Sequence, residues 1–157
     1  MKNVFFPDEE ITYDDLRFVC YMIERTARKL KQPNCYVANK IGKQELAARL
    51  SVANVQHAEN PEAVVQQWTD EYHLEPGTHD VLAVNPDFCT TPPTALQMGK
   101  VYARLIEQTL SSNEDYADAI LRVYNSHICE FLDDYNSSAY YEPSYYIARA
   151  YYQGNFN

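Results

Sequence analysis

The stretch Thr12–Lys31, TYDDLRFVCYMIERTARKLK, decides the fold class because it carries a complete set of helix signals. Thr12 followed three residues later by Asp15 is a capping-box pattern, which marks a helix start. Apolar residues then recur at every third or fourth position, as on one face of a helix: Leu16, Val19, Cys20, Ile23, Ala27 and Leu30. Pro33 disfavours helix in the residue before it, so we predict that this helix ends near Lys31.

Comparable signals predict further helices along the chain. The predicted segments are 34–41, closed by Gly42, then 45–50, 60–74, 94–110, 114–135 and 143–153. The chain has only 4 glycines and no Asn-Gly or Asp-Gly turn, which argues against a β-sandwich or meander. The sequence therefore predicts a mainly α protein, an irregular helical bundle of about six to eight helices. At most one short strand or hairpin is expected, near residues 80–84.

The prolines divide the chain into two parts. Four of the 8 prolines lie in residues 76–93, which otherwise lack a helical pattern. We expect an N-terminal helical half at 1–75, a Pro-rich connector at 76–93 and a C-terminal helical half at 94–157. A chain of 157 residues suits one domain, so the two halves are expected to share one core.

Composition limits the classes of function. The chain is 46% hydrophobic, which is enough for a core. Its net charge of −9 would repel a phosphate backbone, so nucleic-acid binding is not expected. No apolar run is long enough for a signal peptide or a membrane span, so we expect no membrane contact. The four cysteines show no CxxC pair, and without an export signal reduced thiols in the cytoplasm are expected.

Two histidines are candidate metal ligands. His127 and Glu130 are three residues apart on a predicted helix, which resembles half of a carboxylate–histidine site, but the chain has no second copy of this motif. His57 and Glu59 resemble the start of a zinc deaminase signature without its downstream cysteines. We favour a buried or half-buried structural role for His127, helix-end packing for His57, and no cofactor.

Nucleophile and charge motifs are few. Cys89 lies in the connector and is the cysteine most expected to be exposed, although most free cysteines are packed hydrophobes. No Gly-rich phosphate loop is present. Arg25, Arg28, Lys29 and Lys31 place positive charge at the C-terminal end of the first helix, which the helix dipole favours. A docking patch for an acidic partner, including the chain's own acidic half, is the second interpretation of this basic run.

Tyrosine is concentrated at the end of the chain. Half of the 14 tyrosines lie between residues 135 and 152. The candidate interaction surface comprises three adjacent pairs: Tyr140, Tyr141, Tyr145, Tyr146, Tyr151 and Tyr152. Tyrosine tolerates half-burial and is enriched at protein interfaces. The tyrosines are interpreted either as a lid packed on the chain's own helix 114–135 or as one buried face and one face that binds a partner.

The segment 18–72 resembles a family of small helical bacterial proteins of unknown function, whose members are often encoded beside ADP-ribosyltransferase-like toxins. The similar features are the opening FVCYMIE at 18–24, Val55-Gln-His57, and Val64-Val65 with Tyr72 after an Asn-Pro turn. The resemblance implies a bacterial accessory or partner-binding role and supplies no catalytic residues.

Two hypotheses about function follow. The first is a cytoplasmic bacterial helical protein that is not an enzyme and acts through protein–protein contact, with a protein partner or a second copy of itself. The second is a metal- or thiol-dependent enzyme that uses His57, His127 or Cys89.

Overall fold

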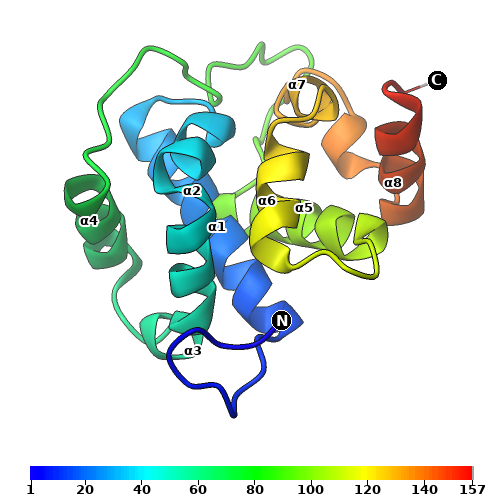
Figure 1. The fold of residues 1–157 in the computed structure, drawn as a ribbon. Helices are drawn as coiled ribbons and strands as arrows, with labels where there is room; N and C mark the ends of the chain where they lie inside the picture. The colour runs from blue at the N-terminus through cyan, green and yellow to red at the C-terminus, as the bar shows by residue number, and fades with distance from the viewer. Residues whose placement is uncertain (157) are drawn as a thin grey trace.

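The computed structural model describes residues 1–156, which are mainly helical, as predicted (Figure 1). Residue 157, the last of the expected C-terminal half, lies outside the described residues. Within 1–156 there are eight α-helices, 60% of the chain is helical, and no sheet forms. The elements are α1 (Tyr13–Leu30), α2 (Asn34–Ser51), α3 (Ala53–Gln56), α4 (Pro61–Glu71), α5 (Ala95–Thr109), α6 (Tyr116–Tyr124), α7 (Ile128–Leu132), the 3₁₀ turn η1 (Ala139–Tyr141) and α8 (Ser144–Gln153).

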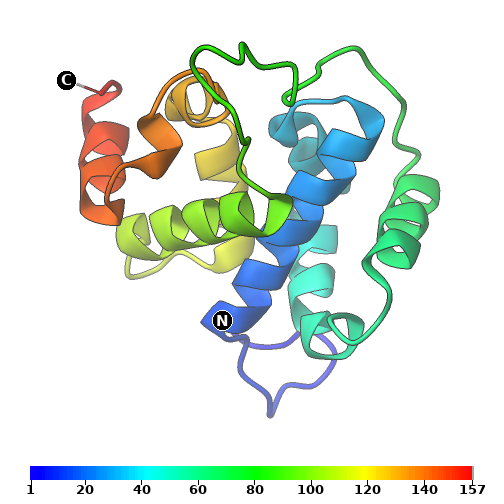
Figure 2. The same ribbon diagram turned by 180° about the vertical axis from the view of Figure 1, so that it is seen from behind.

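Helix α1 is the central element of the fold. Its N-terminus has the predicted capping box between Thr12 and Asp15, and its C-terminus ends at Lys31 in a left-handed conformation. It packs against α2, α4 and α5, and Figure 2 shows α5 crossing it. The crossing is very close because Gly99 has no side chain: a Cβ at this position would lie 2.8 Å from the Tyr21 backbone.

Helix α2 is interrupted at Gly42, as the sequence predicts. Gly42 has φ 79 and ψ 168, a non-helical conformation that glycine adopts readily. The segment therefore consists of two helical pieces on either side of this residue. Further along, Asn60 caps α4 and Pro61 occupies its first turn, so this predicted helix start is confirmed.

The single helix predicted over 114–135 is wrong, because the structure has α6 and α7 with a break between them. Ser126 Oγ donates to the Val123 carbonyl oxygen at 2.6 Å, and Cys129 Sγ donates to the same oxygen at 3.0 Å. Side chains that bond to nearby carbonyls compete with the helical backbone pattern. The apolar spacing continues across the break, which explains why periodicity alone could not reveal it.

The connector (residues 76–93) has no helix and no strand. Near residues 80–84, where a short strand was considered, the chain turns, and Leu82 N donates to Asp80 Oδ1 at 3.1 Å. The start of the connector binds the end of α1: Gly77 N donates to Leu30 O at 2.8 Å and His79 N to Lys31 O at 2.9 Å. These bonds satisfy carbonyls that a helix end leaves free. Figure 1 shows the connector passing over one end of the molecule between α4 and α5.

The buried apolar side chains form one contiguous cluster that draws on both sides of the connector. Its largest members are Trp68 from α4, Tyr102 from α5, Tyr124 from α6 and Tyr135 after α7. The rings of Tyr102 and Tyr124 stack with centroids 4.5 Å apart. Between 1 and 156, no helix is long and apolar enough to cross a membrane.

Candidate functional site

The six candidate tyrosines divide into an exposed set and a packed set. Tyr141, Tyr145 and Tyr152 are 84%, 73% and 70% exposed. The other three are partly buried and have ring contacts within the chain: Tyr140 with Tyr135, Tyr146 with Phe156, and Tyr151 with Tyr152. The structure thus places half of the candidate surface in direct contact with solvent.

Helix α8 has one face toward the protein and one face outward. Ile147 and Ala150 are buried, and the helix packs mainly on α5 rather than on the predicted partner, segment 114–135. On the same side, the Tyr151 hydroxyl accepts a hydrogen bond from Arg122 Nη1 at 2.7 Å, and the Arg122 guanidinium lies 5.4 Å from the Tyr151 ring centroid. The inward side is therefore fixed by packing and by a polar contact to α6.

The outward side of α8 carries Tyr145, Arg149 and Tyr152, here called the α8 stripe. These residues are four and three positions apart, so they lie on one face of the helix. All three are exposed, and Arg149 forms no ion pair within residues 1–156. Tyrosine and arginine are the residue types that most often dominate binding energy at protein interfaces.

The predicted surroundings of His127 and Cys89 are wrong. His127 is exposed rather than buried, because it lies at the break before α7, where its Nδ1 is 3.1 Å from Glu130 Oε2. Cys89 is only 6% exposed, because the connector folds its side chain against the core. His57 lies exposed at the end of α3. Within the described chain, no three His, Cys, Asp or Glu side chains are grouped so that they could hold a metal ion.

A network of polar side chains, which the sequence did not predict, lies where α1, α2, α5 and the chain after α7 meet. This polar network consists of Glu24, Arg28, Asn34, Tyr102, Asp133 and Tyr135. Glu24 is buried and accepts hydrogen bonds from Arg28 Nε and from Asn34 Nδ2, each at 2.9 Å. Asn34 Nδ2 also donates to Asp133 Oδ2 at 3.3 Å, so one amide group joins the two carboxyls.

Arg28 and Tyr135 complete the Glu24 side of the polar network. Arg28 Nη2 donates to the Tyr135 hydroxyl at 3.0 Å and to the Pro93 carbonyl at 2.8 Å. The Tyr135 hydroxyl in turn donates to Glu24 Oε2 at 3.3 Å. A buried carboxylate that is paired and hydrogen-bonded in this way has its charge compensated within the protein.

Asp133 lacks a comparable cation. The Tyr102 hydroxyl donates to its Oδ1 at 2.6 Å, but the carboxyl forms no ion pair within the described residues. Burial, together with the nearby Glu24 carboxylate, raises the pKa of Asp133 to about 8. Both effects disfavour the charged form. Near neutral pH this carboxyl is therefore largely protonated, and strongly shifted groups of this kind are typical of functional sites.

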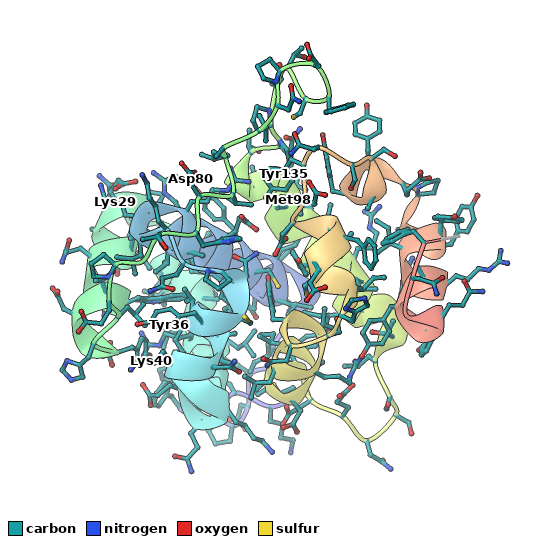
Figure 3. The ribbon with its side chains drawn as sticks, turned by 90° about the horizontal axis from the view of Figure 1, so that it is seen from above. Lys29, Tyr36, Lys40, Asp80, Met98 and Tyr135 are labelled. Carbon is teal, nitrogen blue, oxygen red and sulfur yellow. The ribbon has the colours of Figure 1, made fainter. Side chains whose placement is uncertain are left out.

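A cavity of about 570 Å³ opens beside Asp133. Its lining comes from α2, α6, α7, the connector and the segment after α7, and comprises Pro33, Asn34, Cys35, His79, Asp80, Val81, Ala83, Val84, Tyr124, Asn125, Ser126, Cys129, Glu130, Asp133, Asp134, Tyr135 and Asn136. Figure 3 views the molecule from the connector end and labels two of these residues, Asp80 and Tyr135. A volume of this size is within the range of pockets that bind small molecules.

Cys129, which lines this cavity, is poorly suited to nucleophilic chemistry. Burial raises the pKa of Cys129 to about 12, so this thiol is protonated at neutral pH. Thiolates, not thiols, are the nucleophiles and metal ligands in proteins. Cys89, the cysteine that the enzyme hypothesis names, is not among the lining residues.

The polar network was missed for a physical reason. Arg28 was grouped with the basic run at the end of the first helix, whereas its side chain turns inward to Glu24. The spacing of Glu24 and Arg28, four residues apart on a helix, was the available local signal. Asn34 and Asp133 are 99 positions apart, so only the tertiary fold brings them together.

Comparisons with known proteins give no relationship for this chain: no protein-family model matches it, and no curated protein or solved structure is significantly similar. The resemblance of residues 18–72 to a bacterial family stays a prediction.

Proposed function

We propose that this chain is a cytoplasmic bacterial protein that is not an enzyme and that binds another protein through the α8 stripe. The orientation of α8 supports this proposal. Its inward side is held by Ile147 and Tyr151, while Tyr145 and Tyr152 are 73% and 70% exposed on the opposite side.

The α8 stripe has the composition and rigidity of a binding surface. Each tyrosine offers a large apolar ring and a hydroxyl at a low cost in conformational entropy. The stripe lies on a helix whose backbone is fixed by packing on α5, so binding would not need to order it. Tyr141, at 84% exposure, is the third exposed member of the candidate tyrosines.

The charge of the α8 stripe defines the chemistry of its partner. Arg149 forms no ion pair with any residue in 1–156 and lies between two phenol rings, in a chain whose net charge is −9. A complementary protein surface would present a carboxylate opposite Arg149 and apolar hollows for the two rings. The resemblance of residues 18–72 to small bacterial proteins encoded beside toxins supports an accessory, partner-binding role.

The enzyme hypothesis has less support. His57, His127 and Cys89 belong to different parts of the chain, two of them are exposed and one is buried. No specific observation favours a reaction at any of them.

Site-specific photo-cross-linking in a bacterial host tests the proposed function. A photoreactive amino acid replaces Tyr145 in one variant and Phe88 in the control, because Phe88 is 72% exposed but lies in the connector. We expect a discrete cross-linked protein from position 145 and none of the same mass from position 88. An identical pattern at both positions, or no adduct at position 145, would contradict the proposal.

A further inference from the structure

We propose that the cavity beside Asp133 is a binding site for a small organic cation, a primary amine or a guanidine with an apolar body. This inference is independent of the proposed protein contact, since the cavity and the α8 stripe share no residue.

Asp133 offers the cavity a carboxyl that has no cation paired with it among the described residues. Arg28 lies 2.9 Å from Glu24 and compensates that carboxylate, which leaves Asp133 without a cation of its own in residues 1–156. Asp133 is only partly buried and lines the cavity, so a ligand can approach it. A bound ammonium or guanidinium would favour the charged form of this carboxyl, so Asp133 would release its proton to solvent when the cation binds and would then pair with it.

The rim of the cavity is acidic. Asp80, Glu130 and Asp134 contribute three further carboxyls to the lining, and no lysine or arginine is among the lining residues. Clefts lined by one sign of charge attract ligands of the opposite sign. His79 is the only lining side chain that can become cationic.

The hydrogen-bonding groups of the site also favour a ligand that donates. Asn34 lines the cavity and is only 5% exposed. Its Nδ2 donates hydrogen bonds to two carboxyls, those of Glu24 and Asp133. Its Oδ1 accepts no hydrogen bond within the described residues. Ammonium and guanidinium groups carry only donors, which matches a site with an excess of acceptors.

The remaining lining accommodates an apolar body. Pro33, Val81, Ala83 and Val84 give the wall an aliphatic part, and Tyr124 and Tyr135 add aromatic surface. A hydrated metal ion would gain nothing from these groups. A volume of about 570 Å³ is also far larger than an ion requires.

Isothermal titration calorimetry with matched probes tests the proposal on the intact chain. The cationic probes are tyramine and butylguanidine, and their neutral counterparts are 4-ethylphenol and butylurea. We expect both cations to bind at one site and at least ~tenfold more tightly than their neutral counterparts, since each 1.4 kcal/mol of charge interaction is tenfold in affinity.

Three variants locate the site. Asp133→Asn should weaken binding of the cations by at least ~tenfold, since asparagine has no proton to release and cannot become the carboxylate that pairs with the cation. Glu130→Gln/Asp134→Asn changes exposed residues only, so it should fold normally and weaken binding by a smaller, salt-dependent factor. Glu71→Gln, an exposed change on α4, removes one negative charge outside the lining, against two in the rim variant, and should leave affinity unchanged.

The proposal is overturned by any of three results. One is equal affinity for cationic and neutral probes. The second is loss of affinity in Glu71→Gln as large as in the rim variant, which would mean non-specific attraction to an acidic protein. The third is calcium or magnesium binding that is abolished by Asp133→Asn while neither amine binds. If Asp133→Asn does not fold, the first two results are unaffected, and the rim variant takes the place of Asp133→Asn in the third.

Discussion

At the scale of single residues, Asp133 and Glu24 are chemically similar but differ in their partners. Glu24 has a guanidinium at 2.9 Å, whereas Asp133 has a phenol and an amide as hydrogen-bond donors. The neutral donors hold the Asp133 carboxyl in place without supplying positive charge. Arg28, Cys129 and Tyr135 also interact electrostatically with Asp133. Cys35, His79 and Asp80 line the same cavity.

This difference predicts how stability depends on pH. The pKa of Asp133 is about 8 in the folded chain and ~3.9 for an unperturbed aspartate, so the folded state holds a proton that the unfolded state loses. The contribution of this group to stability is complete below the unfolded pKa and is lost as pH rises toward 8. The slope can reach no more than ~1.4 kcal/mol per pH unit for one proton.

Denaturant unfolding between pH 5 and 9 measures this contribution. Asp133→Asn cannot lose a proton, so its stability should decline less with pH than that of the wild type, and Asp87→Asn is an exposed control. If the free energy of unfolding falls equally with pH in Asp133→Asn and the wild type, Asp133 has the same pKa in the folded and unfolded states, which contradicts the prediction.

Residue environments were harder to predict than residue types. Cys89 was expected to be exposed because it lies in a Pro-rich segment, yet the connector folds its side chain into the core. His127 was expected to be buried because its spacing fits an apolar helix face, yet it lies at a helix break. Exposure depends on which distant elements cover a residue, and a local pattern does not contain that information.

At the scale of elements, helix starts and ends were predicted well because their signals are local. The capping box at Thr12, the helix start near residue 60, the break at Gly42 and the end of the last helix at Gln153 all match the sequence prediction. The division between α6 and α7 was missed because Ser126 and Cys129 end the helix through side-chain bonds. The spacing of apolar residues indicates which side chains are buried. Because buried side chains continue across the break, the spacing does not reveal it.

The close crossing of α1 and α5 predicts that adding a side chain at Gly99 destabilises the protein. Gly99→Ala would place a Cβ 2.8 Å from the backbone of Tyr21, which cannot move aside as a side-chain tip can. Overpacking costs ~1–3 kcal/mol, and alanine's better helix propensity returns up to ~1 kcal/mol. We expect a net loss of stability and a melting temperature lower by several degrees.

A thermal melt of Gly99→Ala beside Lys100→Ala, an exposed change on the same helix, measures this effect. A melting temperature at or above that of the wild type would show that the two helices separate at little cost.

In the molecule as a whole, the fold determines where two candidate binding sites lie, the α8 stripe and the cavity beside Asp133. The sequence alone could not locate either of them. The six tyrosines were recognised from composition, but only the packing of α8 on α5 shows that Tyr145 and Tyr152 face outward while Tyr151 faces Arg122. The cavity beside Asp133 depends on the connector lying near α2, α6 and α7, an arrangement that no local pattern encodes.

If the α8 stripe binds another protein, removal of its aromatic rings should weaken that binding, and a titration measures the loss. The protein cross-linked from position 145, or a second copy of this chain if that is the adduct, is titrated against wild type, Tyr145→Ala/Tyr152→Ala and Phe88→Ala. Truncation of two central aromatic residues typically costs ~2 kcal/mol or more each. We therefore predict at least ~tenfold weaker binding by the tyrosine double variant, with an unchanged melting temperature, and wild-type affinity for Phe88→Ala. Equal affinity of all three proteins would contradict the account.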